Sequence, residues 1–299
     1  MEPARGRAEP GASRYTSLLV EQIGRVRRVT INRPEVKNAL SITCQEELVD
    51  AVLAAARDEA THVVVVRGAG SAFSSGYDLS PRRQRQGLEP ARAENEKSAY
   101  RGSSNVEADL RSLFDTTRRW GAILHADVPV IAQVHGHCLA GATDLVQHCD
   151  LVIVAEDAVI GCPPVRSMGV PPTHMWIYHV GPQWAKRLLL TGDTMTGRRA
   201  AEIGFALEAV PADQLDGHVL ALAERIAMVG RSLLRANKYV VNKALELMGR
   251  DALQEISAAQ DAIAHLSPEF AEFKALARDK GLKHAVRQRD AGFRNGEPL

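Results

Sequence analysis

Two glycine-centred turns carry the residues of this sequence that are best suited to chemistry. The first, SAFSSGYDLS at residues 71–80, follows an apolar run of valines, and the second, GHCLAGATDL at residues 136–145, follows Val130–Val134. A glycine lets the backbone turn sharply and expose its N–H groups to a ligand. Two such groups aimed at one point would make an oxyanion hole, whereas most strand–glycine–helix turns are only connections.

A single carboxylate, Asp144, lies three residues after Gly141. If Gly141 begins a helix, its N–H is one of the donors without a partner inside that helix, and the helix dipole adds partial positive charge there. An acidic side chain in the first turn is favoured by roughly 0.3–1 kcal/mol without any catalytic role. Asp144 is therefore a candidate general base and, alternatively, a charge that only stabilises its helix.

The elements that must position these turns alternate between strands and helices. Val26–Ile31 and THVVVVRGAG have the composition of strands, and residues 41–60 place apolar side chains at helical spacing. A helix near Val106–His125, a strand in PVIAQVHG, a short helix at Gly141–His148 and a strand in LVIVAED follow. The pattern predicts an α/β fold with strands buried on both faces, as in a parallel sheet, so that both turns lie at one edge.

We expect three regions along the chain. The sequence predicts a disordered leader at residues 1–14, the core at residues 15–210, and a helical region at residues 211–299 with breaks at Gly230, Gly249 and Ser267-Pro268. The amphipathic helices of this last region would pack on the core or on another subunit. Within the core, residues 80–108 are almost without apolar side chains. A polar insertion this long predicts a mobile loop, either a lid over the substrate or a plain solvated loop.

Composition excludes several classes of function. The 37 Lys and Arg residues against 36 Asp and Glu give a net charge of +1, so no global charge draws the chain to nucleic acid or to an anionic membrane. No apolar run approaches the ~18 residues of a membrane span. The four cysteines have neither metal-ligand nor disulfide-scaffold spacing, and we interpret them as buried hydrophobes of a cytoplasmic protein without a metal.

Several motifs together resemble the crotonase (enoyl-CoA hydratase/isomerase) superfamily. VTINRPEVKNALS resembles the opening signature of that family, AFSSGYDL its first oxyanion turn, and VPVIAQVHGHCLAGATDLVQHCDLVIVAEDAVIGCPP its core. The resemblance extends over about residues 25–215 and more loosely to GLKHAVRQRDAGF. It implies a ββα spiral core with a C-terminal helical region that takes part in trimerisation, and hence a homotrimer or a dimer of trimers.

The resemblance also implies which residues bind substrate. A coenzyme A thioester carbonyl would lie between the backbone N–H groups of Tyr77 and Gly141, with Asp144 at the position of the first catalytic glutamate. The turn made of Ser75, Gly76, Tyr77, Asp78 and Leu79 would hold the adenine end of the substrate. Basic side chains are candidates for its phosphates or simply face solvent: Arg82, Arg83, Lys280, Lys283 and Arg287. No cofactor is implied beyond the coenzyme A of the substrate.

The sequence departs from the family pattern at the second catalytic glutamate, which corresponds to Pro164. Residues 158–192 contain neither Asp nor Glu, so no shift of register restores it, and Pro172 removes a further position that some members use. Proline cannot transfer a proton, and the two-carboxylate hydratase mechanism cannot run unchanged. Candidates for a replacement are His137, His174, Cys162 and the phenol of Tyr77, with Arg166 as a charge stabiliser.

These features favour an acyl-CoA thioester enzyme whose oxyanion hole stabilises an enolate and whose remaining acid/base is Asp144. The default activity is that of an enoyl-CoA hydratase, a lyase of fatty-acid or related acyl-CoA catabolism. An enoyl-CoA isomerase or an acyl-CoA thioester hydrolase would need fewer protic groups. A catalytically inactive homologue that only binds acyl-CoA is the alternative from another class, and Pro164 is the feature that favours it.

Overall fold

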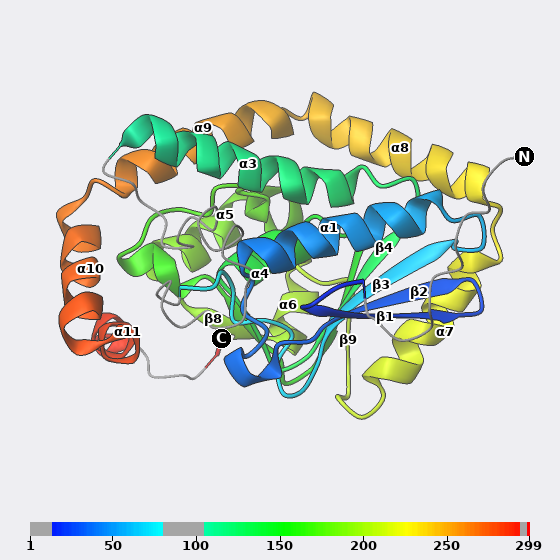
Figure 1. Ribbon diagram of the computed structural model, residues 1–299, viewed down its shortest axis with the longest axis horizontal. Helices are drawn as coiled ribbons and strands as arrows, with labels where there is room; N and C mark the ends of the chain where they lie inside the picture. The colour runs from blue at the N-terminus through cyan, green and yellow to red at the C-terminus, as the bar shows by residue number, and fades with distance from the viewer. Residues whose placement is uncertain (1–13, 80–104, 294–297) are drawn as a thin grey trace, which may run out of the picture.

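The fold is described from a computed structural model, which covers residues 14–79, 105–293 and 298–299 (Figure 1). The predicted leader lies outside the described residues except for Arg14. Most of the predicted polar loop lies outside them as well. The last residues of that loop are described, and there Asn105 caps a helix that begins at Val106 by accepting hydrogen bonds from the N–H groups of Glu107 and Ala108. The loop therefore ends before residue 108, which was its predicted end.

Parallel strands form the centre of the fold. Within the described residues, the larger sheet has six strands in the order β1-β2-β3-β4-β6-β9. β1 and β2 form an antiparallel hairpin, and every later neighbour is parallel. All of the valines of β3 and all of the residues of β4 are buried, as the sequence predicts for strands covered on both faces. The strands are Leu18–Ile23 (β1), Val26–Ile31 (β2), Val63–Gly68 (β3), Val130–Val134 (β4), Leu151–Ala155 (β6) and Glu208–Val210 (β9).

A smaller sheet continues from the larger one. In the described part of the chain it contains β5 (His137–Leu139), β7 (Val159–Gly161) and β8 (Thr194–Thr196), in that order. β5 follows β4 after a short turn, and β7 follows β6 in the same way, so these two passes of the chain add a strand to both sheets before the next helix. This strand–strand–helix progression is the ββα spiral that the resemblance implies. The short helices Pro34–Val36 (η1) and Pro163–Arg166 (η3) complete these connections.

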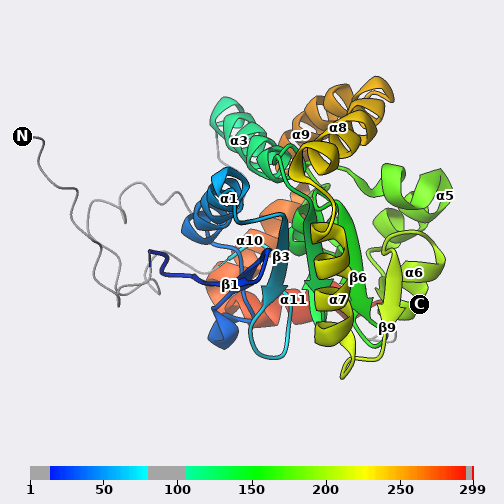
Figure 2. The ribbon, with the colours of Figure 1, turned by 90° about the vertical axis from the view of Figure 1, so that its right-hand side faces the viewer.

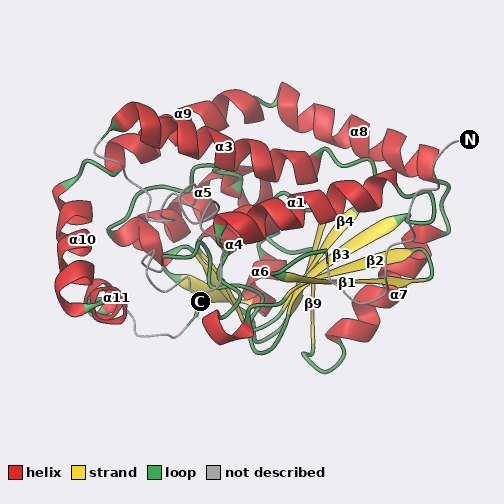
Figure 3. Cartoon of the chain, in the orientation of Figure 1, coloured by secondary structure: helices red, strands yellow, loops and turns green. Residues whose placement is uncertain are grey.

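Helices cover the sheet on both sides (Figures 1 and 3). In these views α1 (Ile42–Arg57) lies above the strands and α7 (Leu215–Ala227) lies below them. α7 contacts β2, β3, β4 and β6, so the first helix of the predicted C-terminal region packs on the core sheet. The other helices up to this point are α3 (Val106–Leu124), α4 (Gly141–Val146), α5 (Trp176–Thr191) and α6 (Gly197–Glu202).

The last four helices extend around the core. α8 (Arg231–Leu247) and α9 (Arg250–Ala264) run along one side, where α9 packs on α3 (Figure 2). α10 (Pro268–Lys280) pairs with α11 (Leu282–Asp290) at one end of the molecule (Figure 1). Gly230, Gly249 and Ser267 cap α8, α9 and α10, so the predicted helix breaks are confirmed. None of the described helices has the length and apolar character needed to span a membrane.

All four cysteines are buried, as predicted. Burial raises the pKa of the Cys44 thiol to about 12 and also raises the pKa of Cys138 and Cys149. These three side chains belong to the main hydrophobic core, where they pack as small apolar groups.

Candidate active site

The two predicted turns meet at one edge of the larger sheet. Phe73 N–H donates to the carbonyl of His135 at 2.8 Å, Ser74 N–H donates to that of His137 at 3.0 Å, and Leu139 N–H returns a 3.1 Å bond to Ser74. These backbone bonds hold the segment after β3 against the segment after β4. The adjacent parallel pairing of β3 and β4 brings the two segments together, as predicted.

Gly76 allows the closest approach between the turns. Its φ of +95° lies in the left-handed region that favours glycine, and a Cβ at this position would lie 2.6 Å from the carbonyl oxygen of Leu139 and 3.1 Å from the nitrogen of Gly141. Any larger residue would therefore separate the turns. The backbones of the Tyr77 and Gly141 turns lie side by side because residue 76 has no side chain.

Helix α4 begins at Gly141, as predicted, directly after a strained residue. Ala140 has φ 53° and ψ −125°, a conformation that L-residues rarely adopt, and its N–H donates to the carbonyl of Gly161 at 2.9 Å. Strain of this kind costs on the order of 1–3 kcal/mol and is concentrated at functional sites. Gly141 is the first residue of the helix, so its N–H has no i−4 partner within it. Asp144 lies in the first turn.

A hydrogen-bonded network fixes the carboxylate of Asp144, which is 2% exposed. The phenol of Tyr77 donates to Asp144 Oδ2 at 2.8 Å, and the hydroxyl of Thr173 donates to Oδ1 at 2.9 Å. The indole N–H of the fully buried Trp120, on α3, donates to the Tyr77 hydroxyl at 2.9 Å. Because the phenol accepts from Trp120, its own proton is directed to Asp144.

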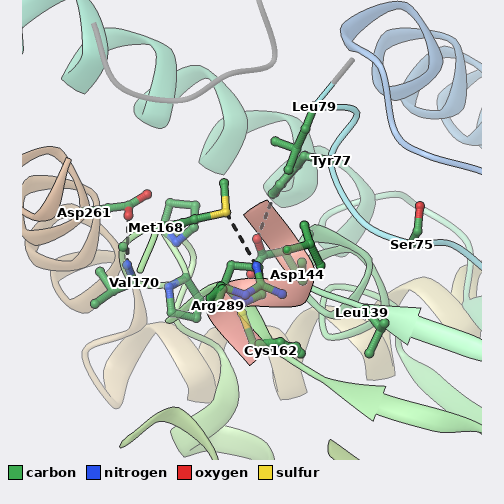
Figure 4. Close-up of a pocket in the computed structure, with 18 of the residues that line it drawn as sticks. Ser75, Tyr77, Leu79, Leu139, Asp144, Cys162, Met168, Val170, Asp261 and Arg289 are labelled. Atoms are coloured by element: carbon green, nitrogen blue, oxygen red, sulfur yellow. Dashed lines mark hydrogen bonds between the residues drawn. The ribbon is translucent and has the colours of Figure 1, made fainter. Parts of the chain in front are cut away.

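The ring of Tyr77 lies directly over the Cα of Gly141. A Cβ on Gly141 would be 2.2 Å from two ring carbons of Tyr77, far inside van der Waals contact. Glycine is therefore required at position 141 for a steric reason as well as for its place at the start of the helix. This contact holds the phenol beside the N-terminus of α4 and next to Asp144 (Figure 4).

A cavity of about 340 Å³ opens beside this network. Tyr77, Gly141 and Asp144 line it together with residues of the segment 162–172, of α9 and of α11 (Figure 4). Most of the lining is apolar, with a few polar side chains at defined points, which is typical of a site for a small organic ligand. Among the described residues, no group of three or more His, Cys, Asp or Glu side chains is arranged to hold a metal ion.

Comparisons with known proteins agree with this architecture. A family model described as enoyl-CoA hydratase/isomerase matches residues 21–294. The chain belongs to the enoyl-CoA hydratase/isomerase family. The predicted resemblance to the crotonase superfamily is confirmed.

Individual members of the enoyl-CoA hydratase/isomerase family cover nearly the whole chain. A probable enoyl-CoA hydratase of Rhizobium meliloti is 31% identical over 275 residues, which are 87% of this chain and 98% of that protein. An enoyl-CoA hydratase structure from Mycobacterium smegmatis superposes with a TM-score of 0.83 at 38% identity, covering 93% of this chain and 94% of that one. An enoyl-CoA hydratase/isomerase structure from Xanthobacter autotrophicus Py2 also gives 0.83, at 35% identity, covering 94% and 99%.

The structure brings most of the predicted site residues to the cavity. Ser75, Tyr77, Leu79, Gly141, Asp144 and Pro164 line it. Gly76 does not, since its role is the close contact between the turns. Asp78 does not either: its carboxylate is 3% exposed and pairs with the guanidinium of Arg33 at 3.0 Å, which fixes the base of the turn.

The candidates for the missing second acid/base also divide into residues that line the cavity and residues that do not. Tyr77 and Cys162 line the cavity, whereas His137, His174 and Arg166 are not part of its lining. Arg166 is paired with Asp290 at 2.9 Å and with Asp193 at 3.5 Å, so its charge is already compensated. Of the basic candidates for phosphate contact, Lys280, Lys283 and Arg287 lie on α10 and α11, and Arg82 and Arg83 lie outside the described residues.

Five further residues at the site were not predicted from the sequence. Trp120 and Thr173 give no local signal, because their only link to Asp144 is made in three dimensions. Asp261 and His265 had a readable signal: they are spaced i, i+4 at the C-terminal end of α9, beside the buried residues Ala258 and Ala262, with His265 as the C-cap residue. Arg289 lines the cavity from α11, and nothing in the sequence distinguished it from the other basic residues of its segment.

Proposed function

We propose that this member of the enoyl-CoA hydratase/isomerase family binds an acyl-CoA thioester with its carbonyl oxygen between the N–H groups of Tyr77 and Gly141. Support comes from the close approach of the two turns at Gly76 and from the start of α4 at Gly141. As the thioester becomes an enolate, negative charge grows on this oxygen, and fixed N–H donors stabilise it. One such donor contributes on the order of 3 kcal/mol to the transition state.

Asp144 and Tyr77 together move the protons. The observation that carries this assignment is the 2.8 Å bond from the Tyr77 hydroxyl to Asp144, beside Gly141 and in the cavity wall. Each carboxylate oxygen has a second lone pair, so Asp144 can also hold a water molecule or take up a proton. The hydrogen bonds from Tyr77 and Thr173 orient the carboxylate toward that task.

The reaction that fits best is the addition of water to a 2-enoyl-CoA. Asp144 takes a proton from water as the water oxygen bonds to the β-carbon, and the C=C electrons move onto the thioester to give the enolate. Return of a proton to the α-carbon restores the carbonyl and completes the hydration. Because Pro164 in the cavity wall cannot transfer a proton, we assign both transfers to Asp144 and Tyr77. In the reverse direction the enzyme acts as a lyase that removes water.

A double-bond shift is the second candidate, and Pro164 favours it. Moving a double bond from the 3- to the 2-position removes one proton and returns it two carbons away. A single acid/base unit can perform both transfers, because the same group that accepts the proton can deliver it. The Tyr77–Asp144 pair is such a unit.

We further propose that the protein acts as a homotrimer, alone or as a dimer of trimers. α8 carries the exposed apolar side chains Leu233, Tyr239, Val240, Val241 and Leu247, each more than 60% exposed in the single chain. Exposed apolar area of this kind is normally covered by another protein. Light scattering that reported a monomer at micromolar concentration would exclude this assembly.

A panel of acyl-CoA substrates tests the proposed function. The purified protein is incubated with 2-enoyl-, 3-enoyl- and saturated acyl-CoAs while absorbance at the enoyl band, product composition and free thiol are followed. Hydration of 2-enoyl-CoA is the expected result, and a double-bond shift with 3-enoyl-CoA would identify the second candidate. Binding without turnover across the panel would show that the protein is a binding homologue, and release of free thiol would show a hydrolase.

A further inference from the structure

Helix α4 is short and carries the carboxylate on which the proposed chemistry depends. It spans six residues, Gly141–Val146, and follows Ala140, whose backbone is strained. A helix of this length is not stable on its own, so contacts from outside must hold it in place. Asp144 lies in its first turn with its side chain buried, and a small rotation of the helix would move the carboxylate.

The imidazole of His148 holds the C-terminal end of this helix. In a regular α-helix the N–H of residue 148 would bond to the carbonyl of Asp144. Here the last turn tightens, and that N–H donates to the carbonyl of Leu145 at 3.1 Å. The ring takes its place, because Nδ1 of His148 lies 2.6 Å from the carbonyl oxygen of Asp144. A carbonyl can only accept, so Nδ1 donates this bond.

A glutamine of α9 keeps the ring in the tautomer that this bond requires. With the proton on Nδ1, Nε2 of a neutral imidazole is an acceptor, and the side-chain nitrogen of Gln254 lies 3.2 Å from Nε2 of His148. Burial lowers the pKa of His148 to about 3, so the ring is neutral near pH 7. His148 is 0% exposed and Gln254 is 5% exposed, so bulk water does not compete for these bonds.

The same face of α9 also reaches the carboxylate of Asp144 by a second route. Ser257 lies three residues after Gln254, and its hydroxyl donates to the carbonyl of Pro171 at 2.7 Å. Two residues after Pro171, the hydroxyl of Thr173 donates to Asp144 Oδ1 at 2.9 Å. One helix of the C-terminal region therefore braces both the backbone and the side chain of Asp144.

We propose that His148 is a positioning residue: its Nδ1–H, oriented by Gln254, fixes the backbone of Asp144 and thereby aims the carboxylate into the cavity. The proposal rests on the proposed function and adds a residue to that same site. His148 acts through Asp144, since it is absent from the described lining of the cavity. Misplacing a reacting group by about 1 Å can cost on the order of 100-fold in rate.

Two substitutions at this position separate the two ring nitrogens. In His148→Asn the side-chain amide nitrogen takes the place of Nδ1 and can still donate to the carbonyl of Asp144. In His148→Gln the amide takes the place of Nε2, so it keeps a contact with Gln254 and loses the donor to Asp144. Both variants remove the imidazole from the same buried position, so both should lower Tm. Only the second should lower kcat strongly.

We expect kcat for hydration of a 2-enoyl-CoA to fall about 10–100-fold in His148→Gln and to stay within about threefold of wild type in His148→Asn. In an Asp144→Asn background, His148→Gln should lower the remaining rate by no more than about threefold, because its effect passes through the carboxylate. Equal losses of kcat in the two His148 variants would overturn the proposal. So would a full further loss in the Asp144→Asn background.

Amide hydrogen exchange followed by mass spectrometry tests the positioning without turnover. The amides of α4 should exchange faster in His148→Gln than in wild type or in His148→Asn. Faster exchange in a protein that converts no acyl-CoA would support the role of His148 in holding Asp144 and refute the proposed catalysis. An unchanged exchange and an unchanged hydration rate in His148→Gln would do the opposite. The two proposals can therefore fail separately.

Discussion

The phenol of Tyr77 donates a 2.8 Å hydrogen bond to Oδ2 of Asp144, a residue 67 positions away in the sequence. Tyr77 reaches it because the turn after β3 lies against the turn after β4, and because Gly141 leaves room for the aromatic ring. Tyr77, whose backbone N–H we propose as one oxyanion donor, thus also orients the carboxylate by its side chain. We expect the chemistry of the site to depend on this pair as one unit.

Tyr77→Phe removes the hydroxyl from this unit. We expect the turnover rate to fall about 10²–10³-fold, because Asp144 loses its orienting donor and its proton partner. The indole N–H of Trp120 also loses its acceptor, which costs about 1–3 kcal/mol of stability. Steady-state kinetics and thermal unfolding measure the two effects.

Trp120→Phe is the control for this prediction. It removes the indole N–H that directs the phenol proton and lowers Tm, yet it leaves both the phenol and the Asp144 carboxylate in place. A loss of rate well below that of Tyr77→Phe, at a similar loss of Tm, would show that stability alone does not explain the Tyr77→Phe defect. Equal losses of rate in the two variants would contradict a role for the phenol in proton transfer.

Asp144→Asn tests the carboxylate itself. An amide keeps the shape of the side chain but cannot act as a base, so the rate should fall about 10²–10⁴-fold. Binding of a saturated acyl-CoA should change by less than about threefold, since the oxyanion donors are backbone groups that remain. An unchanged rate would rule out Asp144 as the acid/base, and calorimetry checks the binding.

Gly141→Ala introduces a methyl group that would lie 2.2 Å from the ring of Tyr77. The ring must move away, and its hydroxyl with it, so we expect a loss of at least about 10² in rate and of about 1–3 kcal/mol in stability. Gly121→Ala in α3 is the matched control, because a Cβ there meets nothing within 4 Å. It should stabilise the helix by about 0.5–1 kcal/mol and leave the rate unchanged.

The buried His148 predicts a loss of stability at acidic pH. Its Nδ1 lies 2.6 Å from the carbonyl oxygen of Asp144, and its Nε2 lies 3.2 Å from the side-chain nitrogen of Gln254, a pair of contacts that suits a neutral imidazole. Burial lowers its pKa from 6.5 to about 3. Above pH 6.5 neither folded nor unfolded chain binds this proton. Between pH 6.5 and 3 only the unfolded chain does, so stability falls as the pH falls, by up to about 1.4 kcal/mol per unit.

His148→Gln isolates this contribution. The variant should be less stable than wild type at pH 7, where a buried contact is disturbed, and the difference should shrink steadily from pH 6 to pH 4.5. Other groups, including His179, whose pKa is also lowered by burial, contribute equally to both proteins and cancel. Urea unfolding across this range measures the difference. A constant gap between the two proteins would show that His148 does not titrate on unfolding.

Much of the fold could be predicted from short-range patterns. The valine runs of β3 and β4 predicted buried parallel strands, and the breaks at Gly230, Gly249 and Ser267 predicted the ends of the late helices, because burial periodicity and capping depend on neighbouring residues. The short strands β5, β7, β8 and β9 were missed, since three residues carry too little periodicity. α7 belongs to the helical region that was expected to pack on the core or on another subunit, and it packs on the core sheet. Its own sequence does not distinguish the two, because both need only an apolar face.

The sequence by itself determined the two glycine turns, the helix start at Gly141, the carboxylate at Asp144 and its absence at Pro164, because each depends on the residue type and its immediate neighbours. Only the tertiary structure decided how Asp144 is held by Tyr77 and Thr173, and that Asp261 and His265 of a distant helix reach the same cavity. A hydrogen bond requires two groups within about 3 Å. For residues separated by tens to hundreds of positions, that proximity is set by the packing of whole helices and strands.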